Sequence, residues 1–246
     1  MTLEQFFAEN REVAIAFSGG VDSAYLLYAA TRYAARVKAY YVSTAFQPEF
    51  ELEDARRLAA DVGADMQVLH VDVLSNSAVT ANPPDRCYHC KRALFTLLAE
   101  RAASDGYSEL IDGTNASDDP GDRPGTRALR ELRVLSPLRE CGITKADVRR
   151  LSREAGLFTY AKPSYACLAT RVPTGRRIEA GALGRIEAAE SALRALGYDD
   201  LRVRLCEGGV RLELPESELE RAVRGRGEIL RALDGMGRVT LDLRGR

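Results

Sequence analysis

A short glycine-containing segment near the N-terminus constrains the fold of this chain more than any other feature. Residues 18–23 read Ser-Gly-Gly-Val-Asp-Ser and directly follow the apolar run Val13–Phe17. A buried strand that ends in two glycines and then enters a helix is typical of a phosphate-binding turn, because glycine permits close backbone approach and positive φ. The free N–H groups and dipole of the helix end favour an anion. We expect both glycines to adopt positive φ, and Asp22 and Ser23 to begin the helix; an ordinary capped turn is the alternative.

Strand and helix patterns alternate through the first two-thirds of the chain. The expected strands are 12–17, 37–44, 64–71 and one through 110–111, and the expected helices are 23–34, 49–62, 88–103 and 144–155. This alternation predicts an α/β fold, a parallel sheet with helices on both faces. Ligands bind such sheets beyond the carboxyl ends of the strands, so the loops after the first, second and fourth strands are the expected site.

The pattern changes near residue 175. The expected elements are then a helix over 178–196, strands over 201–206 and 210–214 joined by a Glu-Gly-Gly turn, a helix over 216–233 and a strand over 239–243. Glycines between two alternating runs are a strong hairpin signal. We therefore predict an N-terminal domain over 1–174 and a small C-terminal α+β domain over 175–246.

Composition excludes several classes of protein. The chain has 246 residues and a formal net charge of −1, which gives no electrostatic footprint for nucleic acid. No apolar run approaches the ~20 residues of a membrane helix, and the N-terminal residues lack the pattern of a signal peptide. We expect a cytoplasmic protein with reduced thiols, in which its five cysteines bind metal, catalyse or pack.

Two cysteine-containing segments point to chemistry. Residues 87–90 read Cys-Tyr-His-Cys, a spacing that suits a metal, cluster or redox site, although it also suits two small core residues on one helix face. Cys167 lies between a proline-containing loop and Arg171, and a nearby cation lowers the pKa of a thiol, so Cys167 is a candidate reactive group; a lone cysteine is otherwise usually inert. Cys141 and Cys206 lie outside any motif and are expected in the core.

Two further segments carry polar residues at the expected binding edge or on one strand face. Residues 112–115 read Asp-Gly-Thr-Asn and follow the fourth strand, where they either face a ligand or cap a helix. Arg202 and Arg204 lie two apart on an expected strand and share a face, which suits a phosphate group. Cross-strand pairing with Glu213 is the alternative.

The segment 18–23 resembles the PP-loop of the ATP pyrophosphatase superfamily, whose members split ATP between its α- and β-phosphates. It is not a Walker A loop, because no Gly-Lys-Ser/Thr follows the glycines. Residues 18–23, 112–115, 165–171 and 202–204 together resemble the LarE family of ATP-dependent sulfur transferases, and the similarity extends over almost the whole chain. That family makes the nickel-pincer nucleotide cofactor of lactate racemase.

The resemblance implies the reaction. A carboxylate of pyridinium-3,5-biscarboxylic acid mononucleotide is adenylated with release of pyrophosphate, and sulfur then displaces AMP to leave a thiocarboxylate. ATP and Mg2+ are the implied cofactors, and a nucleotide substrate and a sulfide donor are the implied small-molecule partners. A homo-oligomer is expected, and neither a membrane nor a nucleic acid is expected as a partner.

The resemblance also implies the site residues. ATP is expected at Ser18, Gly19, Gly20, Val21, Asp22, Ser23, Gly113, Thr114 and Asn115. The substrate is expected at Arg171, Arg202, Arg204, Glu190 and Glu213. Asp22, Ser23 and Cys167 are the expected catalytic residues.

Two sulfur chemistries occur in the family. In one, a lone cysteine gives up its own sulfur; in the other, three cysteines hold a 4Fe-4S cluster and leave one iron open for sulfide. Cys87, Cys90 and Cys167 match the second type. The remaining alternatives are a tRNA thiolase or other small-molecule PP-loop thiolase, an amide synthetase, and a nucleotide-binding protein in which His89 completes a structural zinc site.

Overall fold

The computed structural model describes residues 1–118 and 124–246. These residues form two compact units, each described here by itself: unit 1 comprises 1–72 and 85–164, and unit 2 comprises 73–84 and 165–246. Segment 165–174, which the sequence analysis assigned to the N-terminal domain, packs within unit 2. The domain boundary predicted between residues 174 and 175 stays a prediction.

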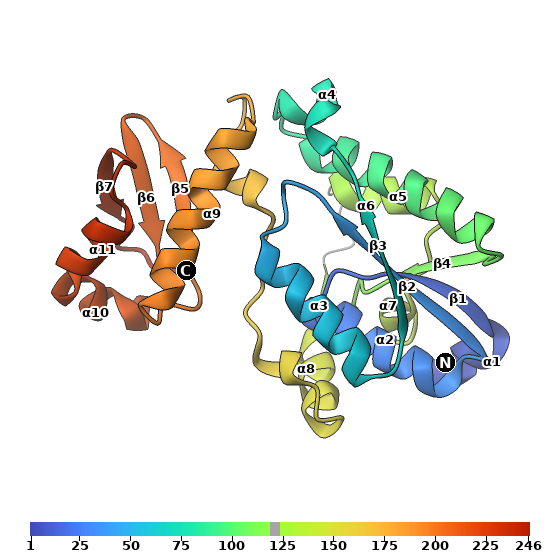
Figure 1. Ribbon diagram of the computed structural model, residues 1–246. Helices are drawn as coiled ribbons and strands as arrows, with labels where there is room; N and C mark the ends of the chain where they lie inside the picture. The colour runs from blue at the N-terminus through green and yellow to red at the C-terminus, as the bar shows by residue number, and fades with distance from the viewer. Residues whose placement is uncertain (119–123) are drawn as a thin grey trace. The chain divides into compact units, whose positions relative to one another are not determined.

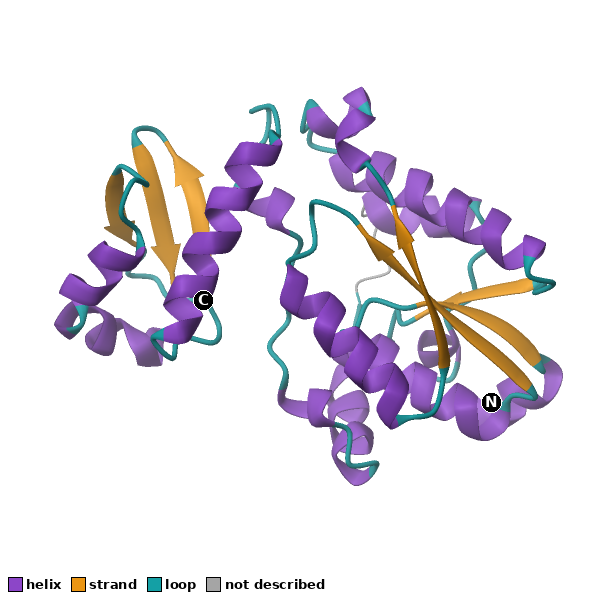
Figure 2. Ribbon diagram, in the orientation of Figure 1, coloured by secondary structure: helices purple, strands orange, loops and turns teal. Residues whose placement is uncertain are grey.

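Unit 1 is built on a four-stranded parallel sheet (Figures 1 and 2). Its strands, in the order β3-β2-β1-β4, are β1 (Glu12–Ala16), β2 (Arg36–Ser43), β3 (Asp65–His70) and β4 (Glu109–Asp112). Its helices are α1 (Leu3–Glu9), α2 (Val21–Tyr33), α3 (Glu49–Asp61), α5 (Arg86–Ser104), α6 (Pro124–Glu131), α7 (Pro137–Glu140) and α8 (Lys145–Glu154), with a 3-10 turn η2 (Phe158–Ala161). The predicted α/β fold is confirmed.

Alternate residues of the central strand face two separate cores. Val13 and Ile15 of β1 pack in one core with Leu26 of α2, whereas Ala14 packs in the other with Leu98 of α5. Both sheet faces are therefore covered by helices, as the continuous apolar run of β1 predicts. The sheet thus leaves its carboxyl edge, where β1 and β4 end, as the place for a ligand.

Unit 2 is a small α+β structure. Its elements are η1 (Val73–Ser75), α4 (Ser77–Thr80), η3 (Leu168–Arg171), α9 (Ala180–Ala195), β5 (Arg202–Cys206), β6 (Gly209–Glu213), η4 (Glu216–Glu218), α10 (Leu219–Arg224), α11 (Arg226–Ala232) and β7 (Arg238–Leu241). The strands form a sheet in the order β5-β6-β7. Strand β5 pairs antiparallel with β6 and is joined to it by a two-residue turn, which confirms the predicted hairpin.

The single helix predicted over 216–233 is wrong. The segment divides into η4, α10 and α11, and Gly225 both ends α10 and precedes α11. Glycine weakens a helix interior, and a Cβ at Gly225 would lie 3.4 Å from the Tyr198 hydroxyl and 3.3 Å from the Arg221 carbonyl oxygen. The break therefore lets the chain pass close to Tyr198.

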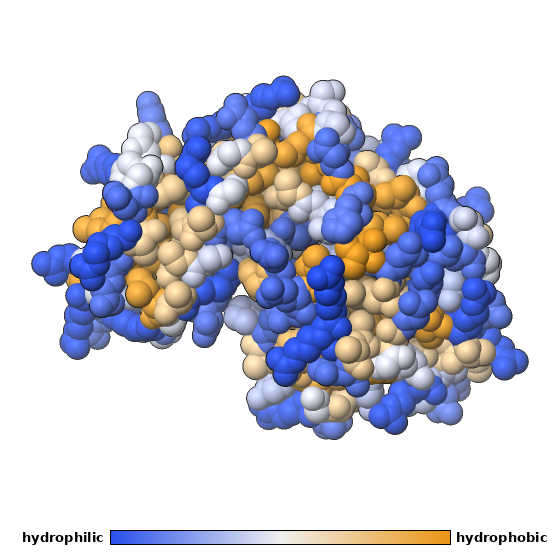
Figure 3. All heavy atoms as spheres, viewed as in Figure 1, coloured by the Kyte–Doolittle hydropathy of each residue, from blue (hydrophilic) through white to orange (hydrophobic). Residues whose placement is uncertain are grey.

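The sheet of unit 2 has one apolar and one charged face. Val203, Val210 and Leu212 pack in a core with residues of α9 and α11. The residues that alternate with them, Arg204 and Arg211 among them, lie on the other face. Hydrophilic side chains cover much of the surface seen in Figure 3. No helix in the described parts of the chain is long and apolar enough to cross a membrane.

Candidate functional site

The segment 18–23 forms the turn between β1 and α2, as predicted. Asp22 lies in the first turn of α2, and Gly20 is its N-cap residue. Gly19 has a φ of +72°, which confirms the prediction for that glycine. The prediction for Gly20 is wrong: its φ is −75°, because an N-cap residue takes an extended conformation before the helix begins.

The hydroxyl of Ser23 holds this turn together. It donates a hydrogen bond to the Gly20 carbonyl oxygen at 3.1 Å and accepts one from the Ser18 amide at 3.3 Å. The two serine hydroxyl oxygens lie 3.0 Å apart. Ser23 is buried, and its hydrogen bonds fix the conformation of the turn.

Two glycines permit close backbone packing around the turn. A Cβ on Gly19 would lie 3.2 Å from the Ala55 Cβ of α3. A Cβ on Gly113, in the turn after β4, would lie 2.7 Å from the Ser23 amide nitrogen. The predicted ATP-binding residues of β1–α2 and of the β4 turn are thus brought together, and only glycine allows the second contact.

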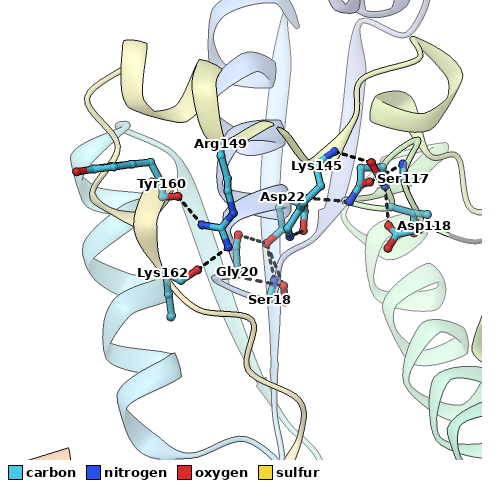
Figure 4. A network of polar contacts seen from close by, with 12 residues as sticks. Ser18, Gly20, Asp22, Ser117, Asp118, Lys145, Arg149, Tyr160 and Lys162 are labelled. Atoms are coloured by element: carbon cyan, nitrogen blue, oxygen red, sulfur yellow. Dashed lines mark hydrogen bonds and ion pairs between the residues drawn. The ribbon is translucent and has the colours of Figure 1, made fainter. Parts of the chain in front are cut away.

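Asp22 is the point where three segments of unit 1 meet (Figure 4). One carboxylate oxygen accepts a hydrogen bond from the Asn115 side-chain amide at 3.1 Å, and the other lies 2.5 Å from the Lys145 ammonium nitrogen. The Asp22 and Lys145 side chains are 23% and 32% exposed, so both remain within reach of a ligand. Asp22 and Asn115 were predicted site residues, and Lys145 was not.

Lys145 is the first residue of α8. Thr144 and Asp147 form the capping box at this helix end, and the Lys145 amide donates to the Ser117 hydroxyl at 2.9 Å. A lysine in the first turn of a helix opposes the helix dipole. That unfavourable position beside a capping box is the sequence signal that could have identified Lys145 as a site residue.

The turn after β4 is built by the buried carboxylate of Asp112. It accepts hydrogen bonds from the Thr114 hydroxyl at 2.6 Å and the Ser136 hydroxyl at 2.7 Å. Asn115 is also buried, and its side-chain oxygen accepts from the Ser117 amide at 2.8 Å. These bonds fix the Asn115 side-chain amide that donates to the Asp22 carboxylate.

The end of η2 and the residue after it are held beside the turn 18–23 (Figure 4). Arg149 of α8 donates to the Tyr160 and Lys162 carbonyl oxygens at 2.6 and 3.1 Å. The Lys162 ammonium group pairs with Glu51 at 3.1 Å and Asp54 at 2.7 Å, both on α3. Helices α3 and α8 therefore both hold segment 160–162.

The three predicted cluster cysteines are distributed between the two units. Cys87 and Cys90 are the second and fifth residues of α5 in unit 1, and Cys167 directly precedes η3 in unit 2. All five cysteines carry thiols rather than disulfides, Cys87 is exposed, and Cys90 and Cys167 are half-buried. Their donor chemistry fits a 4Fe-4S cluster. Among residues 1–118 and 124–246, no three His, Cys, Asp or Glu side chains are grouped to hold a metal ion.

Arg171 and Glu190 form a fully buried ion pair in unit 2. The Arg171 Nε and Nη2 atoms donate to the two Glu190 oxygens at 2.8 and 3.1 Å, and neither side chain is exposed. The Tyr165 hydroxyl also donates to Glu190, at 2.6 Å. Burial opposes the charge of Arg171, but the hydrogen bonds and charge of Glu190 outweigh it and raise the pKa of Arg171.

The same arginine holds the turn that carries Cys167. Its Nη1 atom donates to the Ala166 carbonyl oxygen at 2.6 Å and to the Thr170 hydroxyl at 3.0 Å. The Arg171 side chain is 0% exposed. Substrate binding by Arg171 and Glu190 stays a prediction, and the observed contacts are those of positioning residues.

The remaining predicted substrate residues lie on the charged face of unit 2. Arg204 pairs with Glu213 at 2.7 Å and donates to the Thr170 carbonyl oxygen at 2.5 Å. Burial would raise the pKa of Glu213, but hydrogen bonds from Arg204 and Arg211 lower it. Burial, together with the neighbouring positive charge of Arg246, lowers the pKa of Arg202. Phosphate binding by this face stays a prediction.

Comparison with known proteins gives full-length relatives. Residues 4–104 match the asparagine synthase family. The pyridinium-3,5-bisthiocarboxylic acid mononucleotide synthase of Lactiplantibacillus plantarum is 33% identical over 99% of this chain and 90% of its own length. An uncharacterized protein of Synechocystis is 39% identical over 99% and 92%. The tRNA-specific 2-thiouridylase of Thermotoga maritima is 24% identical over 61% of this chain and 54% of that enzyme.

The full-length match and the local geometry agree. The matched asparagine synthase region contains the whole turn 18–23, and membership of the PP-loop superfamily implies the use of ATP and Mg2+. The similarity to the L. plantarum synthase extends through both units. The chain belongs to the LarE family of the PP-loop ATP pyrophosphatase superfamily.

Proposed function

We propose that this chain is an ATP-dependent sulfur transferase. It adenylates a carboxylate of pyridinium-3,5-biscarboxylic acid mononucleotide and converts it into a thiocarboxylate, for the nickel-pincer nucleotide cofactor. The observation that carries the proposal is the 33% identity to the L. plantarum synthase over 99% of this chain. The proposed setting is the reducing cytoplasm, as a homo-oligomer supplied by a separate sulfide donor.

The adenylation step belongs to residues 18–23 of unit 1, the proposed phosphate loop. A substrate carboxylate oxygen attacks the α-phosphorus of ATP, the bond to the β-phosphate breaks, and pyrophosphate carries away the negative charge. Gly19 and the start of α2 receive the phosphates, since glycine and a helix end suit an anion. Asp22 would hold Mg2+, which would supply positive charge to the phosphates, and Lys145, once released from Asp22, would offer its own positive charge to pyrophosphate.

The sulfur step belongs to the cysteines. Attack of sulfur on the acyl carbon expels AMP and leaves the thiocarboxylate. We propose that Cys87, Cys90 and Cys167 hold a 4Fe-4S cluster, which when bound supplies an iron without a protein ligand for sulfide. Arg171 supports this step by holding the turn of Cys167 through the Ala166 carbonyl oxygen. In the competing chemistry, Cys167 alone gives up its own sulfur. That chemistry assigns no role to Cys87 and Cys90.

The proposal is tested by anaerobic reconstitution with iron and sulfide, followed by ATP and the biscarboxylated mononucleotide. We expect pyrophosphate release and a product in which sulfur has replaced a carboxylate oxygen, read by mass spectrometry. Cys87→Ala, Cys90→Ala and Cys167→Ala should lose the visible chromophore and sulfur transfer while still releasing pyrophosphate.

A parallel reaction with tRNA tests the second candidate. The similarity to a tRNA 2-thiouridylase covers only 54% of that enzyme, and the net charge of −1 does not favour a polyanion. Thiolation of tRNA but not of the mononucleotide would contradict the proposal. A colourless protein with stoichiometric zinc would instead support the nucleotide-binding alternative.

A further inference from the structure

Unit 2 contains a cavity whose lining includes residues outside the predicted substrate site. Its volume is about 400 Å³, and segment 170–174 lines it together with Arg204, Leu205 and Cys206 of β5 and Arg211 of β6. Arg204 was expected to bind phosphate with Arg202, its neighbour on the same strand. The cavity instead brings Arg204 together with Arg211, which belongs to the partner strand of the hairpin.

Arg204 and Arg211 are directly opposite one another in the β5–β6 register. Like charges in that position destabilise a sheet unless anions lie close by. One oxygen of Glu213 contacts both guanidinium groups, at 2.7 Å from Arg204 and 2.9 Å from Arg211. Asp242 lies 3.5 Å from Arg211. The two carboxylates thus balance the opposed pair and hold it in place.

Arg202 adds a further positive charge to this face. Within the described residues it makes no hydrogen bond and no ion pair, and it lies two residues before Arg204 on the same side of β5. The three arginines therefore exceed the two carboxylates, Glu213 and Asp242. A bound anion would complete the charge balance.

The opposed arginines also retain hydrogen-bond donors. A guanidinium group has five N–H donors. Arg204 uses Nε and Nη1, and Arg211 uses Nε and Nη2. In the part of the chain that the structure describes, the Arg204 Nη2 and Arg211 Nη1 atoms have no protein acceptor. Two such groups from facing strands suit the oxygens of a phosphate monoester, which accept charge-assisted bonds from arginine.

We infer that Arg211 acts with Arg204 to bind the phosphate monoester of the mononucleotide substrate in this cavity. Glu213 is a positioning residue, because it contacts both guanidinium groups and carries the wrong charge to touch the phosphate. The inference rests on the proposed function and deepens it, since it adds a residue from the partner strand to the expected phosphate site.

The test measures binding to the full chain by calorimetry, with nicotinate mononucleotide as the probe and its nucleoside without phosphate as the comparison. We expect Arg211→Gln to weaken binding of the mononucleotide by about 10- to 100-fold, the loss of one or two charge-assisted bonds. Binding of the nucleoside and of ATP should not change. Arg238→Gln is the matched control, because Arg238 is an exposed arginine on β7 of the same sheet, outside the cavity lining.

Cys206 gives an independent readout, because it is one of the residues that line the same cavity. The mononucleotide should slow alkylation of Cys206 by iodoacetamide in the wild type but not in Arg211→Gln, as read by peptide mass spectrometry. Equal mononucleotide affinities in the wild type and Arg211→Gln would overturn the inference and leave the proposed function standing. An equal loss of nucleoside affinity would also overturn it. A wild type that binds ATP but not nicotinate mononucleotide would overturn the inference, and only failure to convert the biscarboxylated mononucleotide as well would overturn the proposed function.

Discussion

The two units each contain an ion pair next to a proposed reacting group, and the pairs differ in exposure. In unit 1, Asp22 and Lys145 are 23% and 32% exposed beside the phosphate loop. In unit 2, Arg171 and Glu190 are 0% exposed behind the turn of Cys167. A partly exposed pair exchanges its partners for a ligand at little cost, whereas breaking a buried pair leaves an uncompensated charge.

This difference separates binding from positioning. Asp22 and Lys145 neutralise one another, and both side chains are partly exposed, so a ligand could take the place of either partner. Arg171 has Glu190, Ala166 and Thr170 as protein partners, so its charge serves the shape of the turn.

Removing one member of the buried pair should have the largest effect on stability. Arg171→Met leaves the Glu190 carboxylate buried without its main partner, and we expect a loss of roughly 3–5 kcal/mol in the free energy of unfolding. Urea denaturation followed by circular dichroism measures it. The double variant Arg171→Met/Glu190→Leu should recover much of the loss, and a single variant as stable as the wild type would contradict the positioning role.

Changes in the phosphate loop should act on the rate instead. Asp22→Ala should raise the activation free energy of pyrophosphate release by about 2–4 kcal/mol, because it removes a charged group at the reacting phosphates. Ser23→Ala should have a similar effect through the loop that its hydroxyl fixes. The rates are measured by stopping the reaction at intervals and assaying the released pyrophosphate. Circular dichroism should show an intact fold. Wild-type release in either variant would contradict the assignment of residues 18–23.

Gly113→Ala tests the close contact between the β4 turn and α2. The new Cβ would lie 2.7 Å from the Ser23 amide nitrogen, so the backbone must shift, at a cost of roughly 1–3 kcal/mol. We expect weaker ATP binding together with a lower melting temperature. Gly142→Ala provides a control in which the Cβ meets no atom within 4 Å, although its φ of +68° adds strain; only Gly113→Ala should affect ATP binding.

Lys145→Met should have the smallest effect on stability, about 0–1 kcal/mol, because its ion pair is partly exposed. Its effect should instead appear in ATP affinity and in pyrophosphate release. Lys145→Arg keeps the charge and should recover part of both. If Lys145→Met destabilised the fold as much as Arg171→Met, the distinction between the two pairs would fail.

The sequence predicts those parts of the molecule that depend on neighbouring residues. The turn 18–23, the strands of unit 1 and the β5–β6 hairpin follow from local periodicity and glycine placement. The predicted conformation of Gly20 was wrong because helix α2 begins two residues earlier than expected, so Gly20 is its N-cap residue.

The parts that the sequence did not predict depend on distant contacts. Lys145 reaches Asp22 across 123 residues, and Gly113 meets Ser23 across the sheet edge. The opposition of Arg204 and Arg211 required the strand register. The burial of Glu190 likewise depends on its contacts with Arg171 and the Val203 amide. No pattern within one segment encodes these pairings.

The most direct test of the account counts sulfur atoms transferred per chain and weighs the Cys167 peptide after the reaction. The reconstituted protein is given sulfide, ATP and the biscarboxylated mononucleotide, and thiocarboxylate product is measured by mass spectrometry. We expect more than one sulfur per chain, a requirement for iron, and an unchanged Cys167 peptide. Conversion of Cys167 to dehydroalanine in step with product, without any need for iron, would contradict it.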